Sequence, residues 1–516
     1  MTPARRVLAA TLAITAGGLS GCATAGAQSA TPAPAAAVVA SLEAVATSVQ
    51  TDLDRIFADA TLDRSVLAVH VESLASGRTI YSRNAGTRVV PASVLKLVTA
   101  AVAGDRLGWD HRFETRLDAT GPVVDGRLSG DLIVTGSGDP TITARDLIAA
   151  PLFDEWADAL RAAGITQIDG RVVGDDNSFD DEPLGAGWAW DYLSAAYAAP
   201  SGALSYNENL VVIRVTPGPS PGTAAQVTIG PPGHGLATVN QVSTAAAGTA
   251  VSVFIERMPG SNNVTVRGQV PAGGDDVLRA TTIENPTMFF VEALRAGLAR
   301  RGIAVTGGAY DIDALPMAAS PEVRRVVARH LSPPLSSIVA QMMKTSQNFY
   351  GEMLIKAIGR NAATGDAPGS TERGRQAVRQ TLETWRIPAD ALVMYDGSGL
   401  SRYDYVSAEL LVRVLDRMWQ DEQHRGPFAA ALPVAGHDGT LSARMTETLR
   451  RRVQAKTGTL NHVRSLAGYA ETASGEKIAF VMIANHFVAP NAQVDAVMER
   501  ALERLTSDTT GTTGEP

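Results

Sequence analysis

A block of short strands and glycine-rich turns interrupts a chain whose other parts follow helical periodicity. From about Asp110, apolar and polar residues alternate in short runs separated by Gly-rich turns, and this texture continues for roughly 200 residues, enough for one or two folded domains. Helices are predicted within and after it, at about Ala144 to Ala163 and Pro286 to Arg301. The length of 516 residues therefore predicts two to four domains, of which the β-rich block forms one or two.

The segments on either side of this block predict an α/β or α+β domain. Apolar spacing predicts a helix from Val39 to about Ala60, and alternation predicts a hairpin of strands Val66 to Leu74 and Arg78 to Arg83. An apolar helix follows, which makes the opening of a mixed fold. Further on, the pattern predicts helices at about Ser336 to Arg360, Glu372 to Trp385, Ser407 to Gln420 and Asn491 to Leu505, with strands between the last two.

Three short motifs bear on chemistry. "SVLK" places Ser93 three residues before Lys96 on one helix face, and "SQN" places Ser346 two residues before Asn348 between two helical runs. "KTG" opens with Lys456 at the start of a strand. Each alone has an ordinary reading: a serine after proline caps a helix, and S-x-N is uninformative. In this order and context they match the S-x-x-K, S-x-N and K-T-G signature of penicillin-recognising serine enzymes.

With these motifs the chain resembles the class C low-molecular-mass penicillin-binding proteins, the D-alanyl-D-alanine carboxypeptidase/endopeptidase family. The segments "GSGDPTI", "GDDNSFDD", "SGALSYNEN" and "YDGSGLSR" also look like family segments, so the resemblance covers nearly the whole mature chain. It implies a β-lactamase/transpeptidase-like catalytic domain with β-rich insertion domains. An insertion is required in any case, because the motifs must meet at one site while the β-rich block folds separately.

The resemblance implies a role for each motif residue. Ser93 attacks the carbonyl of the penultimate D-alanine of a cell-wall stem peptide, and Lys96 takes the serine proton. Ser346 relays a proton to the leaving nitrogen, Asn348 orients the substrate amide and Lys96, and Lys456 supplies positive potential. Thr457 and Thr459 bind the terminal carboxylate, Gly458 lets the strand approach the ligand, and the backbone N–H groups of Ser93 and Thr459 face the oxyanion. No cofactor and no metal are implied.

For Lys96 to act as a base near neutral pH, its pKa must be lowered, and both burial and the like charge of Lys456 are expected to lower it.

Asp396 lies in the family-like segment "YDGSGLSR". It is either a catalytic acid or, the favoured interpretation, the residue that closes an Asx turn and positions this loop.

By resemblance, the expected domains are a catalytic domain of residues 41–110 and 325–506, an insertion domain of 111–205 and 283–324, and a nested domain of 206–282.

The N-terminus adds an export signal: Arg5 and Arg6 precede an apolar stretch too short to span a bilayer, within a signal peptide of residues 1–21. Cys22, the only cysteine, follows in "LSGC", which resembles a lipoprotein signal; the alternative is cleavage at a later small-residue site that releases a soluble protein. Residues 22–40 are an Ala/Pro-rich linker, and 507–516 are expected to be a disordered tail.

These observations predict an exported serine D-alanyl-D-alanine carboxypeptidase of the periplasm or cell envelope, held at a membrane through Cys22. It is expected to act on peptidoglycan stem peptides, with endopeptidase cleavage of cross-links left open, and to be acylated by β-lactams. The net charge of −8, spread without long runs, indicates no nucleic-acid partner. Two alternatives remain: a β-lactamase or esterase on the same scaffold, and a cell-wall-binding or β-lactam-sensing protein without turnover.

Overall fold

The central sheet of the fold is built from both ends of the chain. The computed structural model describes residues 48–146, 148–316 and 323–507. Five antiparallel strands occur in the order β2-β1-β22-β21-β20, which leaves β20 at an edge. The hairpin predicted near the N-terminus is confirmed as its first two strands. The strands are β1 (Val66–Ser73), β2 (Thr79–Arg83), β20 (Val453–Leu460), β21 (Val463–Glu471) and β22 (Lys477–Asn485).

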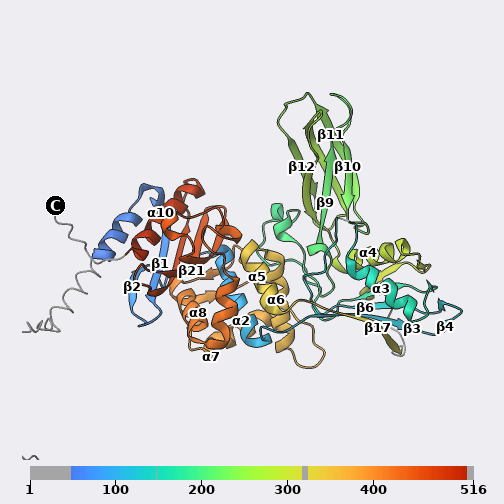
Figure 1. The fold of residues 1–516 in the computed structure, drawn as a ribbon, viewed down its shortest axis with the longest axis horizontal. Coiled ribbons are helices and arrows are strands. Elements are labelled where there is room, and N and C mark those ends of the chain that lie inside the picture. Colours follow the sequence, from blue (N-terminus) through green and yellow to red (C-terminus); the bar gives the residue numbers. More distant parts are fainter. Residues whose placement is uncertain (1–47, 147, 317–322, 508–516) are drawn as a thin grey trace, which may run out of the picture. The chain divides into compact units, whose positions relative to one another are not determined.

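Both faces of this sheet are covered, as its continuous apolar strands require. Successive residues of a strand point to opposite faces, so Ala68 packs with the helical cluster that includes α8 (Ala408–Gln420), while Val69 packs with the cluster that includes α10 (Asn491–Thr506). Figure 1 shows β1 and β21 between α10 and α8. The helix of residues 48–57 contributes Leu53 and Phe57 to the α10 side.

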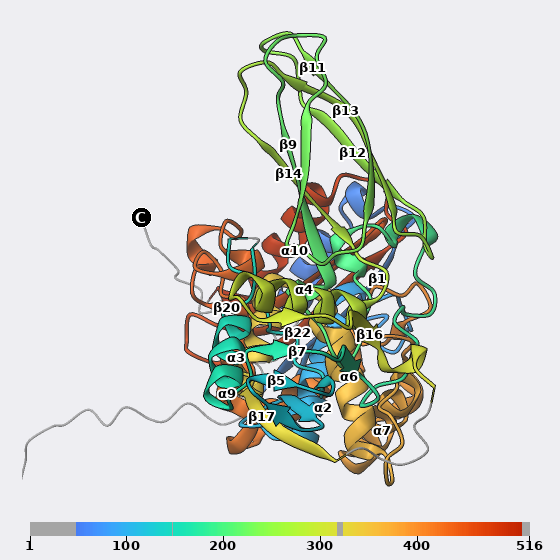
Figure 2. The same ribbon diagram turned by 90° about the vertical axis from the view of Figure 1, so that its right-hand side faces the viewer.

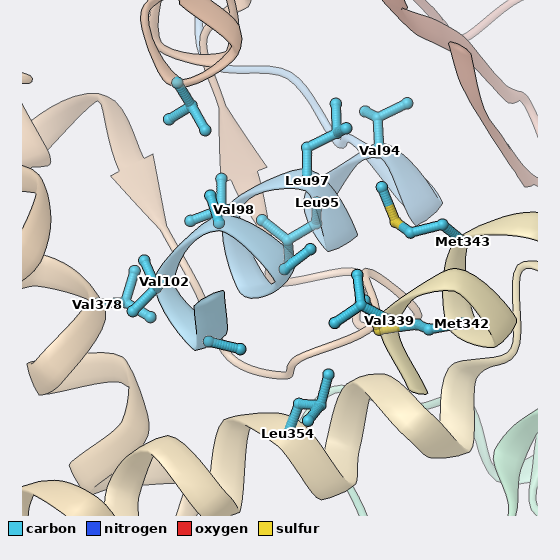
Figure 3. Packing of buried hydrophobic residues seen from close by; sticks show 14 of the residues in the cluster. Val94, Leu95, Leu97, Val98, Val102, Val339, Met342, Met343, Leu354 and Val378 are labelled. Carbon is cyan, nitrogen blue, oxygen red and sulfur yellow. The ribbon is translucent and has the colours of Figure 1, made fainter. Parts of the chain in front are cut away.

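The helix that carries the S-x-x-K motif is packed on all sides by buried apolar side chains. A 3-10 turn, η2 (Ala92–Leu95), leads into α2 (Lys96–Leu107), whose first nine residues are all buried. Figure 3 shows valine and leucine side chains of η2 and α2 packed against three further helices. These helices are α5 (Leu335–Thr345), α6 (Asn348–Ala362) and α7 (Thr371–Thr384), and α8 and α9 (Glu422–Ala431) contribute to the same cluster.

The block inserted after α2 forms two sheets with two helices. One sheet has the order β16-β8-β6-β3-β17 and the other the order β15-β7-β5-β4. Figure 2 shows α3 and α4 beside strands of this insertion, and their side chains share its core. The elements are β3 (Glu114–Thr120), β4 (Val123–Val124), β5 (Arg127–Leu128), β6 (Leu132–Thr135), α3 (Pro151–Ala162), β7 (Gln167–Ile168), β8 (Val172–Asp175), α4 (Pro286–Arg300), β15 (Ala304–Val305), β16 (Ala309–Asp311) and β17 (Arg324–Leu331).

A second set of strands lies within this insertion. It comprises two three-stranded sheets, in the orders β10-β9-β14 and β11-β13-β12. Figure 2 shows these strands gathered into one group. Their bounds are β9 (Leu210–Thr216), β10 (Gln226–Gly230), β11 (Ala237–Ala245), β12 (Ser252–Arg257), β13 (Asn263–Pro271) and β14 (Val277–Thr282).

Three boundaries differ from the sequence-based predictions. The catalytic part does not resume at residue 325, because β17 pairs with β3 along its whole length as far as Leu331. Helix α3 begins at Pro151 rather than near Ala144, since proline fits the first helical turn and the residues before it are irregular. The N-terminal helix ends at Phe57 instead of Ala60.

Several other predictions fall on residues that the structure does not describe. The signal peptide, Cys22, the linker, the first part of the N-terminal helix and residues 508–516 of the C-terminal tail all lie outside the described residues. Among the residues that are described, no helix has both the length and the apolar character needed to cross a bilayer.

Candidate active site

The S-x-x-K motif lies at the junction between η2 and α2. Lys96 is fully buried, and its Nζ lies 2.9 Å from Ser93 Oγ. Ala92, directly before the serine, has a φ of 51°, a left-handed conformation that is uncommon for a residue with a side chain. The preceding segment is fixed by Asn485 of β22, whose Oδ1 accepts a hydrogen bond from the Val90 N–H at 2.8 Å. The serine is thus presented by a strained turn that both the sheet and the helix hold in place.

The S-x-N motif interrupts what would otherwise be one long helix. Ser346 ends α5 in a left-handed conformation, with φ 61° and ψ 32°, and α6 begins at Asn348. Asn348 Oδ1 accepts a hydrogen bond from Lys96 Nζ at 2.7 Å, and its Nδ2 donates to the Tyr197 carbonyl at 2.9 Å. Since Tyr197 belongs to the inserted block, the insertion fixes which way this amide faces.

The third motif runs along the edge strand β20, next to η2. Lys456 is fully buried, and its Nζ donates to Ser346 Oγ at 2.7 Å and to the Thr457 carbonyl at 2.7 Å. Thr457 Oγ1 donates to Thr440 Oγ1 at 2.8 Å. The guanidinium of Arg464 donates to Thr459 Oγ1.

Gly458 is required because the strand passes close to the serine turn. A Cβ at this position would lie 2.9 Å from the Ser93 backbone nitrogen and 2.1 Å from Ser465 Oγ. A methyl group at residue 458 therefore does not fit without movement of the backbone, since Ser465 Oγ is itself bound to the Pro91 carbonyl at 2.7 Å. The three motifs therefore meet at one site, as predicted.

The electrostatics of the two lysines differ from the expectation in one respect. Burial lowers the pKa of Lys96 to about 8, and the nearby carboxyl groups of Asp396, Glu352 and Asp404 oppose that change. Burial, followed by the positive charges of Lys96 and Arg464, holds the pKa of Lys456 well below its usual value. The like-charge repulsion between the lysines therefore lowers the pKa of Lys456 and not that of Lys96.

A cavity of about 450 Å³ opens over these groups. Ser93, Ser346, Asn348, Thr457 and Thr459 from the sequence prediction all line it, whereas Lys96 and Lys456 are buried beside it. Sequence reasoning missed the other lining residues: Tyr192, Tyr197, Gly399, Leu400, Thr440, Leu460 and Asn461. Gly399 and Leu400 lie in the quoted segment "YDGSGLSR", but no pattern pointed to Thr440.

Asp396 positions the loop that carries Gly399. Its Oδ1 accepts hydrogen bonds from the backbone N–H groups of Ser398 at 3.1 Å and Gly399 at 2.6 Å. The Asx turn predicted for Asp396 is therefore present. The Ser398 carbonyl in the same loop accepts a hydrogen bond from Lys96 Nζ at 2.7 Å.

One acidic group has the composition of a cation site. Asp176, Asp311 and Asp313 each offer a carboxylate oxygen, and these oxygens lie within 4.8 Å of one another. They belong to the insertion and are not among the residues that line the catalytic cavity.

Comparison with known proteins agrees with this geometry. The model of the D-Ala-D-Ala carboxypeptidase 3 (S13) family matches residues 49–506. The chain belongs to this family. It is 34% identical over 473 residues to the D-alanyl-D-alanine carboxypeptidase of Actinomadura sp. (strain R39), covering 89% of this chain and 85% of the relative. It is 30% identical over 408 residues to the carboxypeptidase DacB of Haemophilus influenzae, covering 78% and 82%.

Solved structures confirm the fold class. Penicillin-binding protein 4 of Haemophilus influenzae superposes with a TM-score of 0.77 at 26% identity, covering 88% of this chain and 99% of that protein. The same protein in complex with a β-lactam superposes with a TM-score of 0.71. The chain is thus a serine-type hydrolase of the D-Ala-D-Ala carboxypeptidase class, as the sequence predicted.

Proposed function

We propose that this protein removes the terminal D-alanine from peptidoglycan stem peptides through an acyl-enzyme on Ser93. One observation carries the proposal: among the described residues, Lys96 Nζ is bound to Ser93 Oγ and otherwise to two carbonyl oxygens, that of the Asn348 side chain and that of the Ser398 backbone. A neutral amine has two N–H donors and one lone pair. When both donors go to the two carbonyls, the lone pair is left for the serine proton.

The first half of the reaction follows from these contacts. Ser93 Oγ attacks the carbonyl carbon of the penultimate D-alanine, and its proton moves to Lys96 Nζ. The oxyanion develops between the backbone N–H groups of Ser93 and Thr459, where the edge strand β20 borders the serine turn. Because β20 is an edge strand, an extended peptide can lie beside it.

The second half needs a proton on the leaving nitrogen. Ser346 Oγ lines the cavity and is bound to Lys456 Nζ, so it can deliver a proton as the C–N bond breaks and D-alanine departs. Thr457 and Thr459 hold the terminal carboxylate. Water then hydrolyses the Ser93 ester. A β-lactam that enters the same cavity acylates Ser93 in the same way, in keeping with the complex known for a relative.

The test is to incubate the protein with a muropeptide ending in D-Ala-D-Ala, and separately with penicillin, and to follow released D-alanine and the protein adduct by mass spectrometry. We expect release of D-alanine and a long-lived penicillin adduct on Ser93, both lost in Ser93→Ala. Rapid turnover of penicillin without D-alanine release would instead identify a β-lactamase. A penicillin adduct without any release of D-alanine would identify a sensing protein, and an adduct on another serine in Ser93→Ala would overturn the assignment.

We also propose that the protein is exported and that Cys22 carries the lipid anchor. The support is the sequence "LSGC" after a charged and then apolar N-terminal stretch. Two or more acyl chains at one N-terminus hold a protein at a membrane, whereas one chain binds only marginally. Cys22→Ala should move the protein from the membrane fraction to the soluble fraction. An intact mass that begins at another, unmodified residue would contradict the anchor.

A further inference from the structure

Three buried carboxyl groups near Lys96 take no part in the proposed reaction. Asp396 and Asp404, in the loop between β18 (Leu392–Val393) and β19 (Tyr405–Val406), are fully buried, and Glu352 on α6 is 3% exposed. All three act electrostatically on Lys96. Lys456 on β20 interacts electrostatically with Lys96, and carboxylates as close together as these three cannot all be ionised at once.

Asp396 has the hydrogen bonds of an anion. Its Oδ1 accepts the N–H groups of Ser398 and Gly399, while its Oδ2 accepts the Ser401 N–H at 2.6 Å and the Trp188 indole N–H at 2.8 Å. Four donors point at the two oxygens, so a carboxyl proton on Asp396 would compete with these N–H groups for the same oxygens. Donors of this number strongly favour the ionised form.

The other two carboxyl groups have surroundings that favour a bound proton. Glu352 accepts a hydrogen bond from the Gly397 N–H at 3.1 Å and is within hydrogen-bond contact of the Ser398 side chain. Asp404 accepts one backbone hydrogen bond, from the Tyr395 N–H at 2.6 Å. Asp404 is also within hydrogen-bond contact of Asp396. Burial and then the charge of Asp396 raise the pKa of Glu352 to about 8 and hold the pKa of Asp404 well above its usual value.

We propose that Asp396 is the single ionised member of this trio and a positioning residue for Lys96. Glu352 and Asp404 carry their protons, and are therefore uncharged, over the acid limb of the pH–rate profile for Ser93 acylation. Asp396 fixes the loop whose Ser398 carbonyl receives Lys96, and its charge partly offsets the effect of burial on the lysine. A protonated Asp404 donates to Asp396 and completes its shell. The proposal rests on the assignment of Lys96 as the base.

The insertion takes part in this arrangement. Trp188 lies in the inserted block, and its indole N–H donates to Asp396 Oδ2. The same segment is bound to the loop again where Ser401 Oγ donates to the Ala186 carbonyl at 2.7 Å. The inserted block therefore helps to hold the charge that faces the base, in addition to holding Asn348 through Tyr197.

The test compares two matched substitutions, Asp404→Asn and Asp396→Asn. We expect Asp404→Asn to remove the infrared band of one protonated carboxyl group and to leave the acid limb of Ser93 acylation in place, because one neutral group replaces another. Asp396→Asn removes the anion, so the pKa of Lys96 falls and the acid limb moves to lower pH, with at least a tenfold loss of the maximal rate as the loop loses its anchor. A purely structural role would lower the rate without moving the limb.

The infrared measurement keeps the proposal testable if Asp396→Asn does not fold. Glu352→Gln should remove a second protonated-carboxyl band below pH 7. If Asp404→Asn leaves the infrared bands unchanged, or moves the acid limb to lower pH, then Asp404 is ionised and the proposal is overturned. If instead the wild-type protein is never acylated at Ser93, the proposed function fails, which this spectroscopic result distinguishes from an error in the charge assignment.

Discussion

Two buried lysines, Lys96 on α2 and Lys356 on α6, have opposite surroundings. In the part of the chain that the structure describes, the hydrogen-bond partners of Lys96 Nζ are uncharged oxygens: a serine hydroxyl and two carbonyls. Lys356 is 1% exposed, and its Nζ forms an ion pair with Asp180 at 2.7 Å and donates to the Glu182 carbonyl at 2.8 Å. Both partners of Lys356 lie in the insertion. The difference shows that burial alone does not make a lysine a base; direct contact with a carboxylate makes it a structural cation instead.

The largest effect is expected from Lys96→Met. Removal of the base should slow acylation by roughly 10²–10⁴-fold, the usual contribution of a general base. The free energy of unfolding should change by less than about 2 kcal/mol, because loss of a buried polar group offsets the lost hydrogen bonds. Penicillin acylation rates and chemical denaturation measure the two effects. A variant that acylates at the wild-type rate would remove Lys96 from the mechanism.

Lys456→Gln should lower the maximal rate of acylation by roughly 10–100-fold, since Ser346 Oγ loses its hydrogen bond with the Lys456 side chain. The acid limb should stay in place. Burial and the charge of Lys96 hold the pKa of Lys456 well below its usual value, whereas the pKa of Lys96 is set by burial and by the three carboxyl groups of Asp396, Glu352 and Asp404. Stopped-flow acylation across the pH range tests this. A shift of the limb to higher pH would mean that the charge of Lys456 lowers the pKa of Lys96 after all.

Gly458→Ala should slow acylation by roughly tenfold, because the new methyl group must displace β20 from the Ser93 turn. Gly86→Ala is the matched control: Gly86 has no neighbour within 4 Å of an added Cβ and no positive φ. Its acylation rate should equal that of the wild type. If both variants behave alike, close approach of the strand to the serine is not important.

Lys356→Met should give the smallest change in acylation, less than about twofold, together with a loss of about 1–3 kcal/mol in the free energy of unfolding. The reason is that Asp180 and the Glu182 carbonyl lose their partner at the contact between α6 and the insertion. Thermal or urea unfolding and the acylation rate are measured on the same sample. A large loss of acylation with unchanged stability would reverse the comparison between the two lysines.

The sequence predicted those parts of the site that depend on local pattern. The spacing of Ser93 and Lys96, the break between two helices at Ser346 and the strand at Lys456 could all be recognised, because each motif lies within one element or at its end. The side-chain contacts between these elements could not be predicted. Nothing local indicates that Tyr197 would hold the Asn348 amide, or that Thr440 would contact Thr457 across 17 residues.

The fold shows the same division. The hairpin, the central sheet and most helices follow periodicity in short windows. The return of the chain from the insertion was placed too early, because β17 is defined by its pairing with β3, more than 200 residues earlier. Such pairing depends on register between distant segments, which one sequence does not reveal.

The central claim is that a buried, neutral Lys96 takes the proton of Ser93. The most direct measurement is the rate of Ser93 acylation by a chromogenic β-lactam between about pH 5 and pH 10, in the wild-type protein. Protonated Lys96 cannot accept a proton, so the rate should fall about tenfold per pH unit on the acid side of a midpoint near the lysine's pKa of about 8. A rate that stays constant down to about pH 5, or a midpoint near the pKa of about 10.4 for an unperturbed lysine, would contradict this account.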